Sequence, residues 1–308
     1  VAGPIERASH LIPQFESVRT LNWNMIATGS LLFLWGLFQK LVVADNVAPI
    51  ADQAFANSAD LSGAAAVAGI MAFTIQIYCD FCGYSNMARG LARCLGFDLM
   101  ANFNLPYFAR TPSEFWTRWH ISLSSWLRDY LYIALGGNRY GEMKMYRNLM
   151  LTMLLGGLWH GAAWTFVVWG AFHGAIQVVY RVLKIDALLE AVGTRSAKGV
   201  LANGAAWLCT MILVMIGWVF FRATSFTNAA EMLTAATRLD GYSLAAFSTL
   251  LIHVAPLIVV ECFQRWSGRV EWLTVGPFFV RYTAVLAIVM ALLVASAPGG
   301  QSFIYFDF

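Results

Sequence analysis

Long apolar runs set the limits on what this chain can fold into. The sequence contains six of them, at residues 24–44, 61–79, 148–180, 200–221, 246–262 and 282–297. A helix needs about 20 predominantly apolar residues to cross a bilayer, and only helices and closed barrels satisfy their backbone there. We therefore predict an all-α polytopic membrane protein with about six or seven membrane-embedded helices.

The composition supports this class and excludes others. The chain has 308 residues, of which 59% are hydrophobic and 12% charged, whereas a soluble domain carries about 25% charged residues. A net charge of +3 is too small to indicate a nucleic-acid partner. Eight of the 20 Lys and Arg residues lie between Arg89 and Arg147. This block, residues 80–147, is mixed polar and aromatic, and we expect it not to face lipid.

The first residues are unlike a natural start. The sequence begins VAGPIERASHLIPQF, with no initiator Met and no signal-peptide pattern. We expect a fragment whose upstream membrane helices are absent. The remaining chain shows no soluble domain and no internal repeat, so we predict a single membrane domain over 1–308.

The cysteines give little support to a metal site. Cys79 and Cys82 form a C-x-x-C pair, and the other three are Cys94, Cys209 and Cys262. A zinc site needs about four ligands, and no second pair follows. We predict no metal, and interpret these cysteines as small residues near a membrane interface.

Residues 111–133 read as one helix. Thr111 can cap it, Pro112 takes its first position, and Glu114 can close a capping box. At helical spacing the aromatic residues form one stripe, and two polar stripes, one with Arg118 and Asp129 and one with His120, run beside it. Such a helix should line a cavity or lie at the membrane interface.

His160 is the foremost candidate for chemistry. It lies in LLGGLWHGAAWTF, without a neighbouring acid or base. Ionisable groups inside membrane segments usually face the protein interior or a water path, and burial keeps a histidine neutral. A neutral imidazole can accept a proton from a hydroxyl, and the glycines around it leave room for a substrate. The alternative is a core histidine bound to a carbonyl or a tryptophan.

His173 follows His160 by thirteen residues. On one straight helix the two would lie about 20 Å apart along the axis, on different faces, so they could not share a substrate atom. Either the glycines break the helix and fold one segment back, or His173 has a structural role. We favour a structural or supporting role.

Polar residues of the 80–147 block have two readings each. His120 could face a ligand or simply lie at the interface. The basic residues are Arg89, Arg93, Arg110, Arg118, Arg128 and Arg139. They could bind phosphates or an acidic polymer, or they could reflect positive-inside topology. We favour topology for most of them. Asp80 and Asp129 could pair with arginines.

Four segments together resemble a known family. They are AGPIER at 2–7, residues 80–139 with F-W-x-R-W-H-I-S-L-S-x-W-L-R-D-Y, residues 147–174 with G-G-L-W-H-G-A-A-W, and the terminal FIYFDF at 303–308. The chain is similar throughout to the membrane-bound O-acyltransferases, closest to their alginate O-acetylation branch and related to the teichoic acid D-alanyl branch. Cys82 departs from the family pattern, where a serine is expected.

The resemblance implies a fold, a site and an activity. The expected fold is a ring of transmembrane helices around a central funnel, with re-entrant or interfacial helices. His160 and His120 are implied as the catalytic pair in the central cavity, with His173 behind them. We expect the substrate tunnel to include Trp159, Trp119, Arg118, Arg128, Asp129, Gly157 and Gly161.

The implied reaction moves an acetyl or other acyl group from a cytoplasmic thioester donor such as acetyl-CoA toward O-acetylation of an exopolysaccharide such as alginate. No cofactor is expected to stay bound. The expected partners are periplasmic polysaccharide O-acetyltransferase proteins and the lipid bilayer, in the bacterial inner membrane, with no nucleic acid. Two alternatives remain: D-alanyl or other acyl transfer to teichoic acid or lipid by the same fold, and a transporter or proton channel.

Overall fold

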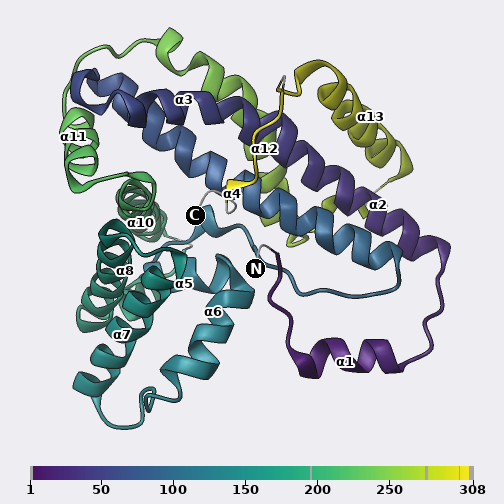
Figure 1. Cartoon of the computed structure of the whole chain (residues 1–308), viewed down its shortest axis with the longest axis horizontal. Helices are drawn as coiled ribbons and strands as arrows, with labels where there is room; N and C mark the ends of the chain where they lie inside the picture. Colours follow the sequence, from purple (N-terminus) through teal and green to yellow (C-terminus); the bar gives the residue numbers. More distant parts are fainter. Residues whose placement is uncertain (1–2, 195, 275–276, 298, 305–308) are drawn as a thin grey trace. The chain divides into compact units, whose positions relative to one another are not determined.

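The structure is a computed structural model that describes residues 3–194, 196–274, 277–297 and 299–304. Every regular element among these residues is a helix (Figure 1), which confirms the all-α prediction. The chain divides into two compact units, residues 1–56, 62–104 and 239–308, and residues 57–61 and 105–238. The single-domain prediction stays a prediction. The end of FIYFDF, at 305–308, lies outside the described residues.

The first unit is built on a pair of long helices that run side by side, α2 and α4 (Figure 1). Glycines make this contact possible: a Cβ on Gly29 would lie 2.6 Å from the carbonyl oxygen of Gly90, and Gly36 faces Gly83 in the same way. Small residues allow such close backbone approach in membranes. The elements of the unit are α1 (Ala8–Glu16), α2 (Trp23–Phe38), the π-helical turn η1 (Gln39–Ala44), α3 (Asp45–Ala56), α4 (Gly63–Cys94), α12 (Leu244–Ser267), η5 (Trp272–Thr274) and α13 (Phe278–Ala295).

The second unit contains the segment predicted to carry the chemistry. It has short helices at its start, an antiparallel pair in its middle and a long apolar helix after them. Its elements are η2 (Ser58–Asp60), η3 (Pro106–Phe108), α5 (Pro112–Arg118), α6 (Ile121–Leu127), the π-helical turn η4 (Arg128–Tyr132), α7 (Glu142–His160), α8 (Trp164–Val182), α9 (Ile185–Val192), α10 (Ala197–Arg222) and α11 (Phe226–Ala236).

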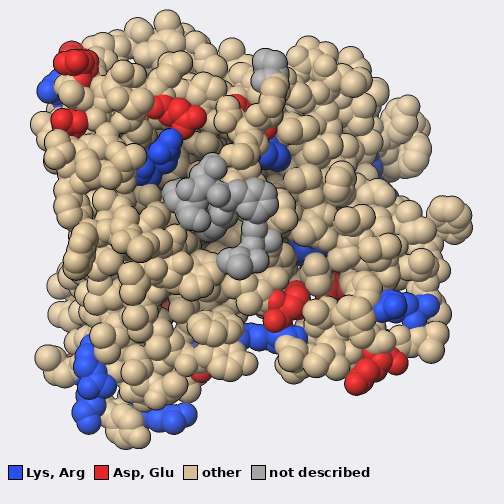
Figure 2. All heavy atoms as spheres, in the orientation of Figure 1, with Lys and Arg blue, Asp and Glu red and all other residues tan. Residues whose placement is uncertain are grey.

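Five helical stretches of the described chain are long and apolar enough to cross a membrane, and a sixth is formed if α8 and α9, bent by 53°, are one span. The five are Trp23–Ala56, Gly63–Cys94, Ala197–Arg222, Leu244–Ser267 and Phe278–Ala295. They cover five of the six predicted runs. On the face seen in Figure 2, most of the surface is uncharged and Lys, Arg, Asp and Glu are sparse.

The sixth run, for which the sequence left a straight and a broken helix open, is broken. Residues 148–180 form the end of α7 and most of α8, separated by an irregular turn at 161–163. Gly157 faces the carbonyl of Phe166 and the backbone of Gly170, and Gly174 faces Met150. The two helices therefore run antiparallel: Gly161 ends α7, and glycines inside both helices let them pack closely.

The prediction of one continuous helix over 111–133 was wrong. It is divided into α5, α6 and η4, with a break at Trp119 and His120. His120 has φ 41° and ψ 55°, which is left-handed backbone, uncommon for a residue other than glycine. The start of the prediction holds, because the backbone N–H of Glu114 donates to Thr111 Oγ1 at 3.2 Å.

Candidate active site

His160 is the last residue of α7, and aromatic rings surround it. Its ring centroid lies 5.2 Å from that of Trp169 on α8 and 5.1 Å from that of Phe221 on α10. Phe166 follows at 6.4 Å. Because α8 folds back along α7, side chains distant in sequence enclose the imidazole.

A cavity of about 460 Å³ reaches His160 from one side. Its wall near the imidazole includes Gly156, Trp116 and Trp169. Gln177 and Arg181 continue the wall along α8, and residues of α6 and η4 form the other side: Ile121, Leu123, Ser124, Ser125, Leu127, Arg128 and Tyr132. The candidate base is therefore only half-buried, and the accessible part of its ring belongs to the cavity wall.

His120 occupies the break between α5 and α6 and is buried, with 2% of its surface exposed. The structure brings it near His160, close enough that a charge on His160 opposes protonation of His120. Left-handed backbone at a non-glycine residue costs of order 1–3 kcal/mol and persists where the surroundings impose it, often at functional sites. Among the described residues that line the cavity, His120 is not included.

Both imidazoles are held in the neutral form. Burial lowers the pKa of His160 to about 3. Burial, and secondarily the neighbouring His160, lower the pKa of His120 well below its usual value. A neutral imidazole offers one nitrogen that accepts a proton and one that donates a hydrogen bond, so the pair can supply both functions at neutral pH.

His173 lies in an aromatic core behind Trp169. Its ring is fully buried, 5.0 Å from Trp169 and 5.2 Å from Trp116, and it stacks on Phe115 at 6.4 Å. Gly217 packs directly on its Nε2. Of the two alternatives in the sequence, the glycines do break the helix, yet Trp169 separates the two imidazoles. The supporting role of His173 stays a prediction.

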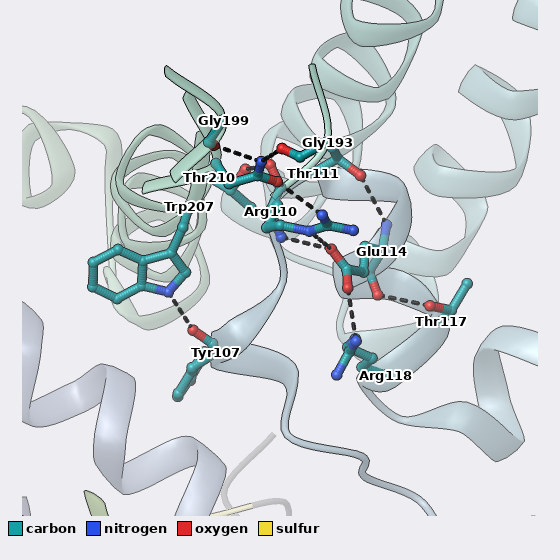
Figure 3. A network of polar contacts seen from close by, with 11 residues as sticks. Tyr107, Arg110, Thr111, Glu114, Thr117, Arg118, Gly193, Gly199, Trp207 and Thr210 are labelled. Carbon is teal, nitrogen blue, oxygen red and sulfur yellow. Dashed lines mark hydrogen bonds and ion pairs between the residues drawn. The ribbon is translucent and has the colours of Figure 1, made fainter. Parts of the chain in front are cut away.

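A charged network fixes the start of α5 (Figure 3). One oxygen of Glu114 accepts from the backbone N–H of Arg110 at 2.8 Å and from its Nε at 3.2 Å, and the other accepts from Arg118 Nη2 at 2.7 Å. Arg110 also donates to Asn203 on α10 at 2.8 Å. Burial favours the neutral acid, but the Arg110 backbone N–H and the charges of Arg118 and Arg110 outweigh it and lower the pKa of Glu114. Sequence reasoning missed this role and assigned Glu114 only to the cap.

The residues expected along the tunnel occupy different places. Arg128 lines the cavity and pairs with Asp129 at 2.8 Å. Trp159 is 43% exposed, and Trp119 is buried against Trp218 at 4.8 Å. Gly161 faces the ring of Phe166, and Gly157, as described above, lies in the contact of α7 with α8. The tunnel assignment stays a prediction.

The first unit has its own charged cluster. Lys40 donates to Asp45 at 2.7 Å and to Asp80 at 2.6 Å, with both carboxylates buried. Asp80 therefore pairs with a lysine, not with an arginine as expected. Arg89 and Arg93 pair with Glu271 at 3.1 and 2.7 Å. No group of three or more metal-ligating side chains was found in the described part of the chain.

Comparison with known proteins agrees with this architecture. Residues 1–221 match the model of MBOAT, the membrane-bound O-acyltransferase family. A probable alginate O-acetylase of Azotobacter vinelandii is 48% identical over 235 residues, which is 76% of this chain and 45% of that protein. A peptidoglycan O-acetyltransferase of Helicobacter pylori is 42% identical over all of this chain and 62% of its own length.

A more distant relative is a teichoic acid D-alanyltransferase of Streptococcus thermophilus, 28% identical over 58% of this chain and 46% of that protein. The chain thus spans about half the length of these relatives. With several candidate spans it is a multi-pass membrane protein. It belongs to the membrane-bound O-acyltransferase family.

Proposed function

We propose that the protein transfers an acyl group from a thioester donor to a hydroxyl acceptor at His160. The observation that carries this proposal is a neutral imidazole on the wall of a cavity large enough to hold a thioester next to a hydroxyl. His160 takes the hydroxyl proton while the oxygen attacks the thioester carbonyl. The C–S bond then breaks, and the leaving thiolate takes the proton from His160. Positioned general-base catalysis of this kind contributes about 10²–10⁴-fold.

His120 is the proposed partner in this step. A neutral imidazole beside the base can donate a hydrogen bond to the oxyanion that forms on the carbonyl. Its ring is buried in the break between α5 and α6 and does not line the cavity, so the hydrogen bond forms only when the ring turns toward the reacting carbonyl. This assignment extends the sequence-based pairing of the two histidines.

The charge of the cavity supports an anionic donor such as acetyl-CoA. Arg128 and Arg181 line it, and no Asp or Glu is among the described lining residues. Along α8, Trp169 beside His160 and Arg181 lie about 18 Å apart at 1.5 Å rise per residue. A pantetheine arm, extended at about 3.5 Å per three bonds, spans about 15 Å between its phosphate and its sulfur. Its phosphate would then reach Arg181 with the thioester at His160.

The proposed acceptor pathway follows the relatives. Two of them are named for O-acetylation of alginate and peptidoglycan, so we propose acetyl transfer toward an exopolysaccharide, completed by periplasmic acetyltransferase proteins. The corresponding location is the bacterial inner membrane. The relative named as a teichoic acid D-alanyltransferase makes D-alanyl transfer a second candidate. Transfer from a D-alanyl carrier protein, and not from acetyl-CoA, would identify it.

The test replaces His160 in the full-length protein in its native membrane. His160→Ala should abolish acetylation of the polymer while the amount of protein in the membrane is unchanged, and His173→Ala should do less harm. His253→Ala, a histidine of the span α12, is the matched control and should keep full activity. Normal acetylation by the His160 variant would reject the base assignment.

A further inference from the structure

Two residues of the cavity wall, one at the end of α6 and one on α7, are in contact one helical turn from the candidate base. Gly156 precedes His160 by one helical turn, so the two lie on the same face of α7. Both line the cavity, and so does Leu127, the last residue of α6. A Cβ built on Gly156 would lie 3.3 Å from Cδ1 of Leu127. The tip of Leu127 therefore packs against the backbone of Gly156, and we call this contact the constriction.

The constriction leaves no room between α6 and α7 at Gly156. Contacts of 3.4–4 Å between carbon atoms are ordinary van der Waals distances, so the gap between Leu127 and Gly156 does not accept even one methyl group on the glycine without a shift of the leucine. Trp169, which lines the same cavity, and Phe221 pack against the His160 ring at 5.2 and 5.1 Å. An acyl chain that grows from the reacting carbonyl soon meets one of these walls.

The constriction is held in place by the chain around it. Leu127 is followed at once by the π-helical turn η4, and the next residue, Arg128, also lines the cavity. π-Helical turns inside helices are frequent at functional sites. Here the widened turn accompanies two consecutive residues on one cavity wall, an apolar one toward the base and a cationic one after it.

We propose that Leu127, packed against Gly156, determines the length of the acyl group and restricts the enzyme to acetyl donors. The proposal rests on acyl transfer at His160. Removing the leucine side chain opens the apolar space beside the base and admits longer chains. Adding a methyl group at Gly156 fills that space and hinders even acetyl.

The experiment measures initial transfer rates from acetyl-, propionyl- and butyryl-CoA with the full-length protein in membranes. The wild type should use acetyl-CoA and discriminate against the longer donors. Leu127→Ala should raise the butyryl-to-acetyl rate ratio by about fifteenfold, because each buried methylene contributes about fourfold. Gly156→Ala should lower all rates, most for the longer donors. Leu155→Ala, an exposed residue of the same helix, is the control and should keep the wild-type ratio.

The outcomes separate the two levels of the proposal. A wild type that transfers no acyl group from any thioester contradicts the proposed function. A wild type that transfers acetyl, together with an unchanged ratio in Leu127→Ala, overturns the role of Leu127 alone. If Leu127→Ala is inactive with every donor, Leu127→Val decides: it should raise the butyryl-to-acetyl ratio by a smaller factor, and an unchanged ratio refutes the role of Leu127.

Discussion

Glu114 connects the first turn of α5 to its last residue, and we expect its charge to stabilise the second unit. Both carboxylate oxygens are engaged, with arginine contacts at 2.7, 2.8 and 3.2 Å, and the side chain is only 20% exposed. Glu114→Gln keeps the shape but turns an NH₂ group toward an arginine N–H. Two charge-assisted hydrogen bonds are then lost or weakened.

The magnitude follows from burial. A hydrogen bond to a charged group contributes about 1.5–3 kcal/mol when buried, and an exposed ion pair about 0–1 kcal/mol. At intermediate exposure, two such contacts give a loss of about 2 kcal/mol. For a chain of 308 residues, with an unfolding entropy of about 2.1 cal/mol/K per residue, this loss lowers the thermal midpoint by about 3 °C. Thermal unfolding of the purified protein in detergent measures this shift of the midpoint. The control is Glu190→Gln, because Glu190 is an exposed acid on α9.

The pH dependence sharpens this test. The pKa of Glu114 is lower in the folded state, so the unfolded state binds more protons and stability rises with pH. The contribution is fully present above the unfolded carboxyl pKa, about 4.3, and is lost as pH falls through the folded pKa. The deficit of Glu114→Gln should therefore be full at pH 7 and shrink in strong acid. A midpoint equal to that of Glu190→Gln at pH 7 would refute the reasoning.

Three further predictions follow from other contacts. Gly157→Ala should impair assembly of the α7–α8 pair, whereas Gly204→Ala, which has open space, should not; membrane yield and thermal midpoint compare them. Lys40→Met leaves two buried carboxylates without their cation and should cost about 3–5 kcal/mol, which is measured as loss of folded protein after detergent extraction. Because burial lowers the pKa of His160 to about 3, the rate should not fall between pH 7 and about pH 5; an acid limb near pH 6.5 in kcat/KM would contradict this.

Much of the fold could be predicted from the sequence because it depends on local patterns. Apolar runs of sufficient length predicted five spans, and the Thr111–Glu114 spacing predicted the start of α5. The break at His120 could not be predicted, since the residues of 111–133 keep helical spacing throughout and left-handed backbone at a histidine depends on the surrounding structure. The turn at 161–163 was left open because the same glycines suit both a broken and a continuous helix.

The candidate base could be predicted from the sequence, but most residues of the cavity wall could not. His160 stands out because a titratable ring in an apolar run is conspicuous. Arg181 and Leu127 do not stand out, because they reach the same cavity only after α8 folds back along α7 and α6 breaks away from α5. The helix cap already explained Glu114 in the sequence, so its contacts with Arg110 and Arg118 were not predicted.

His160 and His120, the two histidines of the site, are held in place by different physical means. His160 is kept neutral by aromatic rings, which cost little to assemble because their burial is favourable in itself. His120 requires a strained backbone, and that strain must be offset by contacts on either side of it. Arg118 lies two residues before it, held by Glu114, and Ser124 lies four residues after it, with its backbone N–H on the His120 carbonyl at 2.9 Å. Loosening either contact should therefore disturb the orientation of His120 and lower the catalytic rate, in addition to any loss of stability.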